Sequence, residues 1–110
     1  MHMGGVATIG DNKPNNFTHI LLNNKVHESV GGQRTTSGII NYSEIAKACG
    51  YKKIFKNINS LSKLKSALIR TKNMKGLKFI ECVVSPGHRK NLGRPKESPV
   101  ENKNSFMKKS

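Results

Sequence analysis

A pair of amides is the first feature of the sequence whose chemistry suits ligand binding. Asn23 and Asn24 directly follow a short apolar run, and three more polar groups come soon after them: His27, Glu28 and Ser29. Amide and carbonyl oxygens are hard ligands of the kind that Mg²⁺ takes, and an imidazole can exchange a proton near neutral pH. Asparagine also favours turns, and His27 has the alternative of being an ordinary solvated loop histidine. From these residues alone, a ligand site and a simple turn both stay open.

Further along the chain, an amide and two arginines offer groups that bind anions. Gln33 follows Gly31 and Gly32, where the backbone can adopt positive φ or approach a ligand closely, and its amide can hydrogen-bond an oxyanion. Arg89 and Arg94 lie in a cationic stretch near the C-terminus, and a guanidinium fork suits a dianion. An ordinary loop, and a tail that wraps across a neighbouring subunit, are the alternatives for these two segments.

Alternating helices and strands are expected to position these groups. Apolar spacing and β-rich runs predict helices over residues 1–9, from Ser43 to Cys49 and from Ser60 or Ser62 onward, and strands over residues 17–22, 51–55 and 77–84. This order predicts an α/β fold, with a partial parallel sheet covered by helices on both faces. The sheet is expected to be incomplete at its N-terminal side, because no capping residue precedes the first helix. Ligands bind such sheets beyond the carboxyl ends of the strands, which is where the amide pair falls.

The chain divides by composition into a body and a tail. Residues 1–84 hold all the predicted strands and are expected to form one partial domain, including a long irregular loop over residues 25–37. Residues 85–110 are rich in Pro, Gly, Lys and Asn and are expected to form a basic tail. A short helix over residues 99–107, opened by Ser98 and Pro99, is predicted within this tail.

Composition narrows the class of protein. A chain of 110 residues has room for one small domain. Its net charge of +14 is typical of nucleic-acid-binding proteins, but the cations are spread over successive elements, and 2 Tyr and 4 Phe are few for a base-stacking surface. Duplex DNA binding that weakens steeply with salt would support the alternative of a small basic nucleic-acid-binding protein. No apolar run approaches the roughly 20 residues that cross a bilayer. Cys49 and Cys82 are expected in the core, which fits a reducing cytoplasm.

The motifs together resemble a known enzyme family. The segments at residues 1–10 (MHMGGVATIG), 19–33 (HILLNNKVHESVGGQ), 45–51 (IAKACGY) and 87–95 (GHRKNLGRP) are similar, in the same order, to the diphosphate-binding region of phosphonopyruvate decarboxylases. These are thiamine-diphosphate-dependent 2-oxo-acid decarboxylases, and the resemblance covers nearly the whole chain. The signature of this enzyme class opens with Gly-Asp-Gly and closes with Asn-Asn. Only its second half is present, and the first half is expected a few residues before Met1.

The resemblance implies cofactors and site residues. It implies thiamine diphosphate and Mg²⁺, with the Asn24 side chain and the backbone carbonyl of Val26 as metal ligands. The residues that it assigns to the cofactor are Asn23, Asn24, His27, Glu28 and Ser29, and His27 is a candidate for a catalytic role. The anion-binding chemistry described above makes Gln33, Arg89 and Arg94 the candidates for the substrate. The chain departs from the family pattern at four places: Glu28 replaces Asp, Arg34 replaces Pro, and Lys25 and Val26 replace small residues.

The implied activity is decarboxylation of 3-phosphonopyruvate to 2-phosphonoacetaldehyde and CO₂. Sulfopyruvate decarboxylase is the near neighbour, because both substrates are small 2-oxo acids with a second anion. Activation of the cofactor requires a Glu from a pyrimidine-binding N-terminal domain of the same or another subunit, and a homo-oligomer is expected for the full-length enzyme. Because that domain and the metal-binding Asp are absent from these 110 residues, the isolated chain is expected to be inactive.

Overall fold

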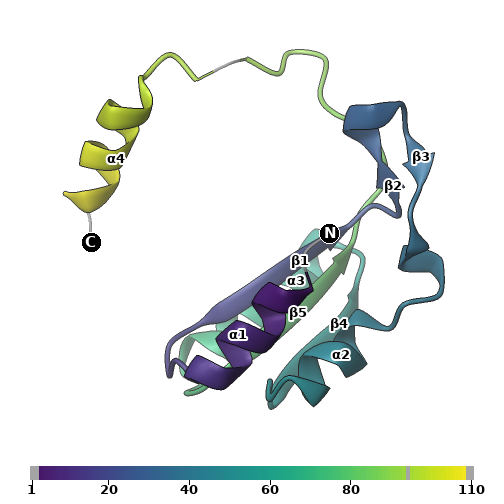
Figure 1. The fold of residues 1–110 in the computed structure, drawn as a ribbon, viewed down its shortest axis with the longest axis vertical. Coiled ribbons are helices and arrows are strands. Elements are labelled where there is room, and N and C mark those ends of the chain that lie inside the picture. The colour runs from purple at the N-terminus through teal and green to yellow at the C-terminus, as the bar shows by residue number, and fades with distance from the viewer. Residues whose placement is uncertain (1–2, 94, 109–110) are drawn as a thin grey trace.

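Three parallel strands form the centre of the protein. The computed structural model describes residues 3–93 and 95–108. Strand β5 (Lys78–Val83) lies between β1 (Thr18–Asn23) and β4 (Lys53–Ile58) and is hydrogen-bonded to both in parallel register (Figure 1). The run from Leu77 to Ile80 is buried without interruption, as is typical of a strand whose two faces are both covered.

Helices cover both faces of this sheet. α1 (Gly4–Asn12) and α2 (Tyr42–Ala48) pack on one face around Phe79, whereas α3 (Leu61–Lys72) packs on the other face around Ile80. Successive strand residues point to opposite faces, so neighbouring residues of β5 serve two separate cores. The chain crosses from β1 to β4 over one face and returns to β5 over the other, so both crossovers have the same hand. The predicted α/β class, with a parallel sheet and helices on both faces, is confirmed.

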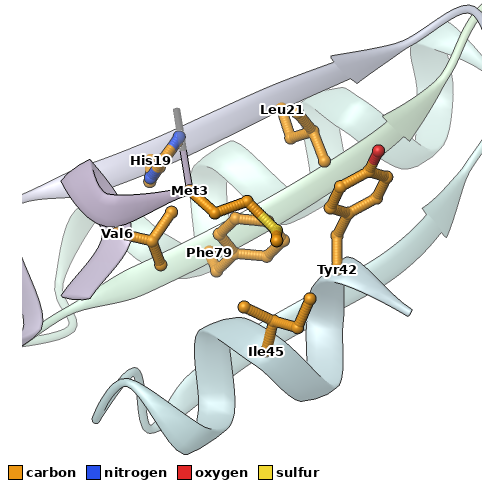
Figure 2. Close-up of a pocket in the computed structure, with 7 residues that line it drawn as sticks. All are labelled: Met3, Val6, His19, Leu21, Tyr42, Ile45 and Phe79. Atoms are coloured by element: carbon orange, nitrogen blue, oxygen red, sulfur yellow. The ribbon is translucent and has the colours of Figure 1, made fainter. Parts of the chain in front are cut away.

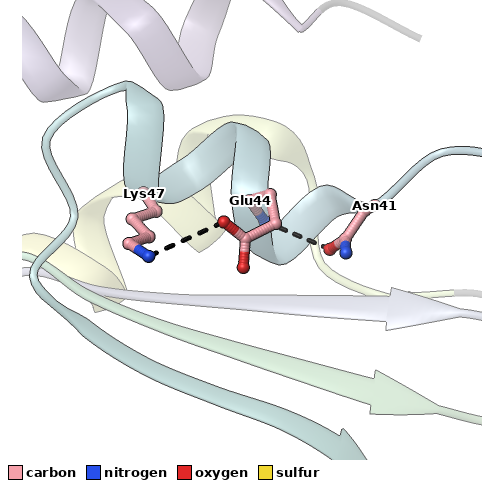
Figure 3. Close-up of polar contacts among 3 residues, drawn as sticks. All are labelled: Asn41, Glu44 and Lys47. Carbon is pink, nitrogen blue, oxygen red and sulfur yellow. Dashed lines mark hydrogen bonds and ion pairs between the residues drawn. The ribbon is translucent and has the colours of Figure 1, made fainter.

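The short helix α2 is capped by a residue that the sequence pattern did not single out. Asn41 Oδ1 accepts a hydrogen bond from the Glu44 backbone N–H at 3.1 Å, and the Glu44 carboxylate lies 3.7 Å from Lys47 Nζ (Figure 3). Ser43, predicted as the cap, is instead buried inside the helix. Ser60 does cap α3, through a bond from Lys63 N at 3.3 Å, as one of the two predicted alternatives.

Helix α1 continues past its predicted end at Ile9. Gly10, Asp11 and Asn12 are turn formers by type, yet they complete the helix, and Lys13 ends it in the left-handed region with φ 46°. The reason is tertiary, because Gly10 lies against α2. A Cβ built on Gly10 would lie 1.8 Å from the backbone oxygen of Cys49. The glycine therefore serves close packing of two helices and does not break the first one.

The segment between β1 and α2 is more ordered than predicted. An irregular loop is expected over residues 25–37, but the chain forms a small antiparallel hairpin from β2 (Val26–His27) and β3 (Gln33–Arg34). Two 3₁₀ turns, Glu28–Val30 and Thr36–Gly38, complete it. The β2–β3 hairpin stands beyond the carboxyl edge of the sheet (Figure 1).

The C-terminal helix α4 (Pro99–Met107) stands apart from the sheet, at the end of an extended segment (Figure 1). Ser98 and Glu101 form a reciprocal capping box, with Pro99 in the first turn, so the helix start is set by local sequence. Of the helices in residues 3–93 and 95–108, none has the length and apolar character needed to span a membrane.

Candidate functional site

The amide pair lies where β1 ends. Asn23 is the last residue of the strand, pairs with Val83 of β5 and is only 8% exposed. Its Oδ1 accepts a hydrogen bond from Lys25 N at 3.1 Å, and Asn24 Oδ1 accepts one from Val26 N at 3.2 Å. Two overlapping side-chain turns of this kind bend the backbone sharply, and Lys25 between them has φ 63°. The position at the carboxyl edge is the one that the sequence predicts.

The Asn24 side chain is oriented by contacts at both of its polar atoms. While Oδ1 accepts from Val26, Nδ2 donates to Glu28 Oε2 at 2.9 Å. The other oxygen of the same carboxylate, Oε1, accepts a hydrogen bond from the backbone N–H of Gly87. Both oxygens of Glu28 therefore have partners within the chain.

The carbonyl of Val26 faces away from the hairpin partner. The carbonyl oxygens on either side of it are used within the hairpin: Lys25 O accepts from Thr35 N and His27 O accepts from Gly32 N, both at 3.1 Å. Successive carbonyls of an extended segment point to opposite sides, so the oxygen of Val26 points away from β3.

The donor chemistry of the Asn24 Oδ1 and Val26 carbonyl oxygens suits a hard cation. Asn24 Oδ1 retains a lone pair beside its bond from Val26 N, and both oxygens are neutral, as suits a cation that is shared with an anionic diphosphate. No group of three or more His, Cys, Asp or Glu side chains able to hold a metal occurs within residues 3–93 and 95–108. A metal at this edge would need further ligands such as phosphate oxygens and water.

The other predicted site residues are exposed around the same hairpin or lie in the segment after β5. His27 Nδ1 lies 3.1 Å from Ser29 Oγ, and Gln33 pairs with His27 across the two strands. Arg89 is exposed, two residues beyond the Gly87 that binds Glu28. Arg94 lies outside the described residues. The structure therefore gathers Asn24, His27, Glu28, Ser29 and Gln33 at one edge, and it places Arg89 in the segment tied to them.

One polar residue at this edge was not singled out from the sequence. Glu81 of β5 accepts from Ser43 Oγ at 2.9 Å and from Asn23 Nδ2 at 3.5 Å, and so links α2, β5 and β1. A carboxylate inside an apolar strand is costly to bury unless it is hydrogen-bonded. Its position within the apolar run 77–84 was the signal that could have identified Glu81 as part of a network.

A mainly apolar cavity of about 210 Å³ lies between α1, α2 and the sheet (Figure 2). Its lining residues are Met3, Val6, His19, Leu21, Tyr42, Ile45 and Phe79. Burial lowers the pKa of His19, whose Nδ1 lies 3.2 Å from Tyr51 Oη. None of the described residues predicted for the cofactor or substrate lines this cavity, so it is separate from the amide pair.

Positive charge surrounds the candidate site. In the part of the chain that the structure describes, the single ion pair joins Lys47 to Glu44 within α2 and involves no residue of the loop. Lys25, Arg34, Arg89 and Lys90 therefore bring cations to the loop and to the segment after β5 without a carboxylate partner at ion-pair distance. Such an edge attracts anions.

Comparison with known proteins identifies relatives for nearly the whole sequence. Residues 1–82 match the family described as thiamine pyrophosphate enzyme, C-terminal TPP binding domain. Phosphonopyruvate decarboxylases of Streptomyces viridochromogenes and Streptomyces hygroscopicus are each 39% identical to this chain over 101 residues, which is 92% of the chain and 25% of the relative. Sulfopyruvate decarboxylase subunit beta of Methanococcus maripaludis is 31% identical over 107 residues, or 97% of the chain and 56% of that subunit.

The chain thus spans a quarter of the length of the phosphonopyruvate decarboxylases and about half of the length of the sulfopyruvate decarboxylase subunit. The family match covers α1, the sheet and the loop after β1 and ends within β5. The similarity to the decarboxylases continues into the tail, because 101 and 107 matched residues exceed the 82 of the family match.

Proposed function

The chain belongs to the thiamine pyrophosphate enzymes and carries their C-terminal cofactor-binding domain; from this premise we propose that it is the diphosphate- and Mg²⁺-binding part of a phosphonopyruvate decarboxylase. The observation that carries this proposal is the placement of Asn24 at the carboxyl end of β1, with its amide oriented by Val26 and Glu28. The 39% identity to two phosphonopyruvate decarboxylases supports the choice of substrate.

In this proposal, the Asn24 side chain and the Val26 carbonyl hold Mg²⁺, and the surrounding loop binds the diphosphate. When bound, thiamine diphosphate supplies an electron sink for loss of CO₂ from a 2-oxo acid. The loop supplies orientation: Asn23 anchors the strand end, and Ser29 lies beside the imidazole of His27. His27 is exposed at this edge and is assigned proton exchange with the substrate.

The second anion of the substrate is assigned to cations and an amide. Gln33 lies on the β2–β3 hairpin and Arg89 follows β5, so both belong to segments next to the amide pair. Arg94 is included on the chemistry of its guanidinium and on the sequence alone. A guanidinium binds a phosphonate or a sulfonate with similar geometry, and the 31% identity to a sulfopyruvate decarboxylase subunit favours sulfopyruvate as the second candidate substrate.

The proposal includes a partner domain that binds the pyrimidine ring, from the same or another subunit, and a homo-oligomer. Ile20 and Leu22 of β1 are 42% and 66% exposed, on the sheet face that α3 shares with Ile80, and this apolar strip supports packing against further polypeptide. Without that domain, the 110 residues are proposed to be inactive. Free Cys49 and Cys82 agree with a cytoplasmic enzyme.

Binding of the cofactor by the chain itself tests the proposal. In ¹⁵N-labelled protein titrated with thiamine diphosphate and Mg²⁺, we expect shifts in the backbone signals of residues 23–33 that disappear with EDTA. Asn24→Ala should weaken this binding at least about tenfold, because a metal ligand is lost. Asn16→Ala is the matched control, since Asn16 lies at the amino end of β1. Shifts that do not depend on Mg²⁺, or an Asn24→Ala variant with unchanged cofactor affinity, would refute the site.

Turnover is tested separately by CO₂ release. The chain alone should show no decarboxylation of 3-phosphonopyruvate or sulfopyruvate, whereas a chain joined to a pyrimidine-binding domain should prefer 3-phosphonopyruvate. A preference for sulfopyruvate would select the second candidate. Activity of the unaided 110 residues would contradict the proposed need for a partner.

A further inference from the structure

We propose that Glu28 is a positioning residue that ties the loop after β1 to the segment after β5. One oxygen of its carboxylate binds the Asn24 side-chain amide at 2.9 Å, and the other accepts from the backbone N–H of Gly87. In this assignment Glu28 does not touch the cofactor, unlike the role implied by resemblance. The bridge itself follows from the hydrogen bonds, and its consequence for the reaction rests on the proposed function.

Only a carboxylate can make this bridge. Both partners present N–H donors, and an ionised carboxylate offers two acceptor oxygens and no donor. A glutamine of the same length offers one oxygen and one NH₂ group, so it can satisfy either Asn24 or Gly87 and must turn a donor toward the other. Charge-assisted hydrogen bonds are also stronger than neutral ones. The bridge therefore depends on the chemistry of Glu28 and not on its size.

The first consequence is the orientation of the Asn24 amide. Because Glu28 holds Nδ2, Oδ1 is directed to the opposite side, where it meets Val26 N. Without the carboxylate, the bond from Val26 N alone orients the amide, so the positions of its oxygen and nitrogen are less firmly fixed. A metal ligand that is not held in this way binds its metal more weakly, as is found when residues that orient a ligand are removed.

The second consequence concerns the cationic segment. Gly87 is separated from Glu28 by 59 residues in sequence, so the bond joins two parts of the chain that leave the sheet from different strands. Gly87 has φ 118°, a conformation that side-chain-bearing residues rarely adopt. The hydrogen bond to Glu28 holds the chain at this turn. His88, Arg89 and Lys90 follow directly. The bridge thereby keeps the cations of Arg89 and Lys90 beside the loop that is proposed to bind the diphosphate.

The bridge is tested by NMR on the 110-residue chain without cofactor. The two reporters are the backbone amide of Gly87 and the side-chain NH₂ of Asn24. In Glu28→Ala both signals should move, and hydrogen exchange at Gly87 should accelerate about tenfold for loss of one hydrogen bond to a charged group. Glu28→Gln should disturb at least one reporter, whereas Glu28→Asp, which keeps two acceptor oxygens, should restore both.

Glu97→Gln is the matched control, because it removes the same charge from the tail. It should leave both reporters in place. If Glu28→Ala unfolds the chain, Glu28→Gln and Glu28→Asp still decide the question, since Gln conserves the volume of Glu and Asp removes only one methylene. Reporters that do not respond to Glu28→Gln, or that respond equally to Glu97→Gln, would overturn the bridge.

Titration with Mg²⁺ and thiamine diphosphate then separates the two proposals. A functional bridge predicts that Glu28→Gln binds about tenfold more weakly than the wild type and that Glu28→Asp recovers the affinity. If the wild type binds no cofactor while the reporters still respond to Glu28, the proposed function fails and the bridge stands. Normal cofactor affinity in Glu28→Gln, with disturbed reporters, would overturn the positioning role.

Discussion

Backbone conformation singles out Lys25 among the residues of the loop. It lies between the two side-chain turns of the amide pair and adopts φ 63°, where a Cβ is unfavourable. The family pattern that the sequence resembles has a small residue here. This chain therefore has a strained conformation at the residue that adds a cation beside the proposed diphosphate site, and strain of this kind is often found at functional sites.

Replacing Lys25 with glycine is expected to stabilise the fold. Relief of the left-handed strain should contribute up to about 1 kcal/mol, because it outweighs the added entropy of the unfolded chain. Urea denaturation of Lys25→Gly measures this. Lys53→Gly in β4 is the control, where glycine replaces an exposed strand residue in register with Lys78 and should be destabilising. Equal losses in the two variants would contradict the strain at Lys25.

His19 should make folding stability depend on pH. Burial lowers its pKa from the ordinary value of 6.5, so the unfolded chain takes up a proton before the folded chain does. Stability is therefore complete above about pH 6.5 and falls as the pH drops through the folded-state pKa. Denaturation midpoints at about pH 7.5 and pH 5 should differ more for the wild type than for His19→Asn, which cannot titrate.

His88→Asn is the control for this measurement, because His88 is exposed in the segment after β5. It should keep the pH dependence of the wild type. A His19→Asn variant with an undiminished pH dependence would show that other groups titrate on unfolding.

At the level of helices and strands, the tight contact between α1 and α2 sets a steric requirement at Gly10. Gly10→Ala would place its Cβ 1.8 Å from Cys49 O, a backbone atom that cannot move alone. We expect a loss of about 2 to 3 kcal/mol in the free energy of unfolding. Gly5→Ala in the same helix meets nothing within 4 Å and should gain about 0.5 to 1 kcal/mol. A tolerated Gly10→Ala would contradict the packing of the two helices.

The local sequence pattern predicted which helices and strands form, but it did not predict where several of them begin and end. The strand ending at the amide pair and the helix beginning after Ser60 are encoded by neighbouring residues. The cap of α2 is Asn41 and not Ser43, because Ser43 is buried and donates a hydrogen bond to Glu81 of β5. The hairpin in the loop after β1 lacks the apolar alternation of longer strands, so no periodic signal marked it.

Across the whole molecule, the tail extends away from the sheet and α4 stands apart from it (Figure 1). Deleting residues 95–110 is therefore expected to leave the unfolding midpoint nearly unchanged, since α4 adds no burial to either core cluster. Deleting residues 85–110 should additionally remove the Gly87 bond to Glu28 and accelerate hydrogen exchange in the loop over residues 24–34.

Thermal melts and hydrogen exchange of the two truncated chains measure these effects. The predicted division into a domain over residues 1–84 and a tail over residues 85–110 depends on the result. A large loss of stability on deleting residues 95–110 would place part of the tail within the domain.

Short-range sequence patterns were sufficient to identify the α/β class, the strand that ends in the amide pair and the family. Periodicity, turn formers and short motifs are all properties of neighbouring residues. These patterns did not reveal that Glu28 meets Gly87, that Glu81 binds Ser43, or that Gly10 lies against Cys49. These contacts join residues that are 59, 38 and 39 positions apart. Their geometry exists only once the sheet brings the ends of β1 and β5 together and packs α1 beside α2.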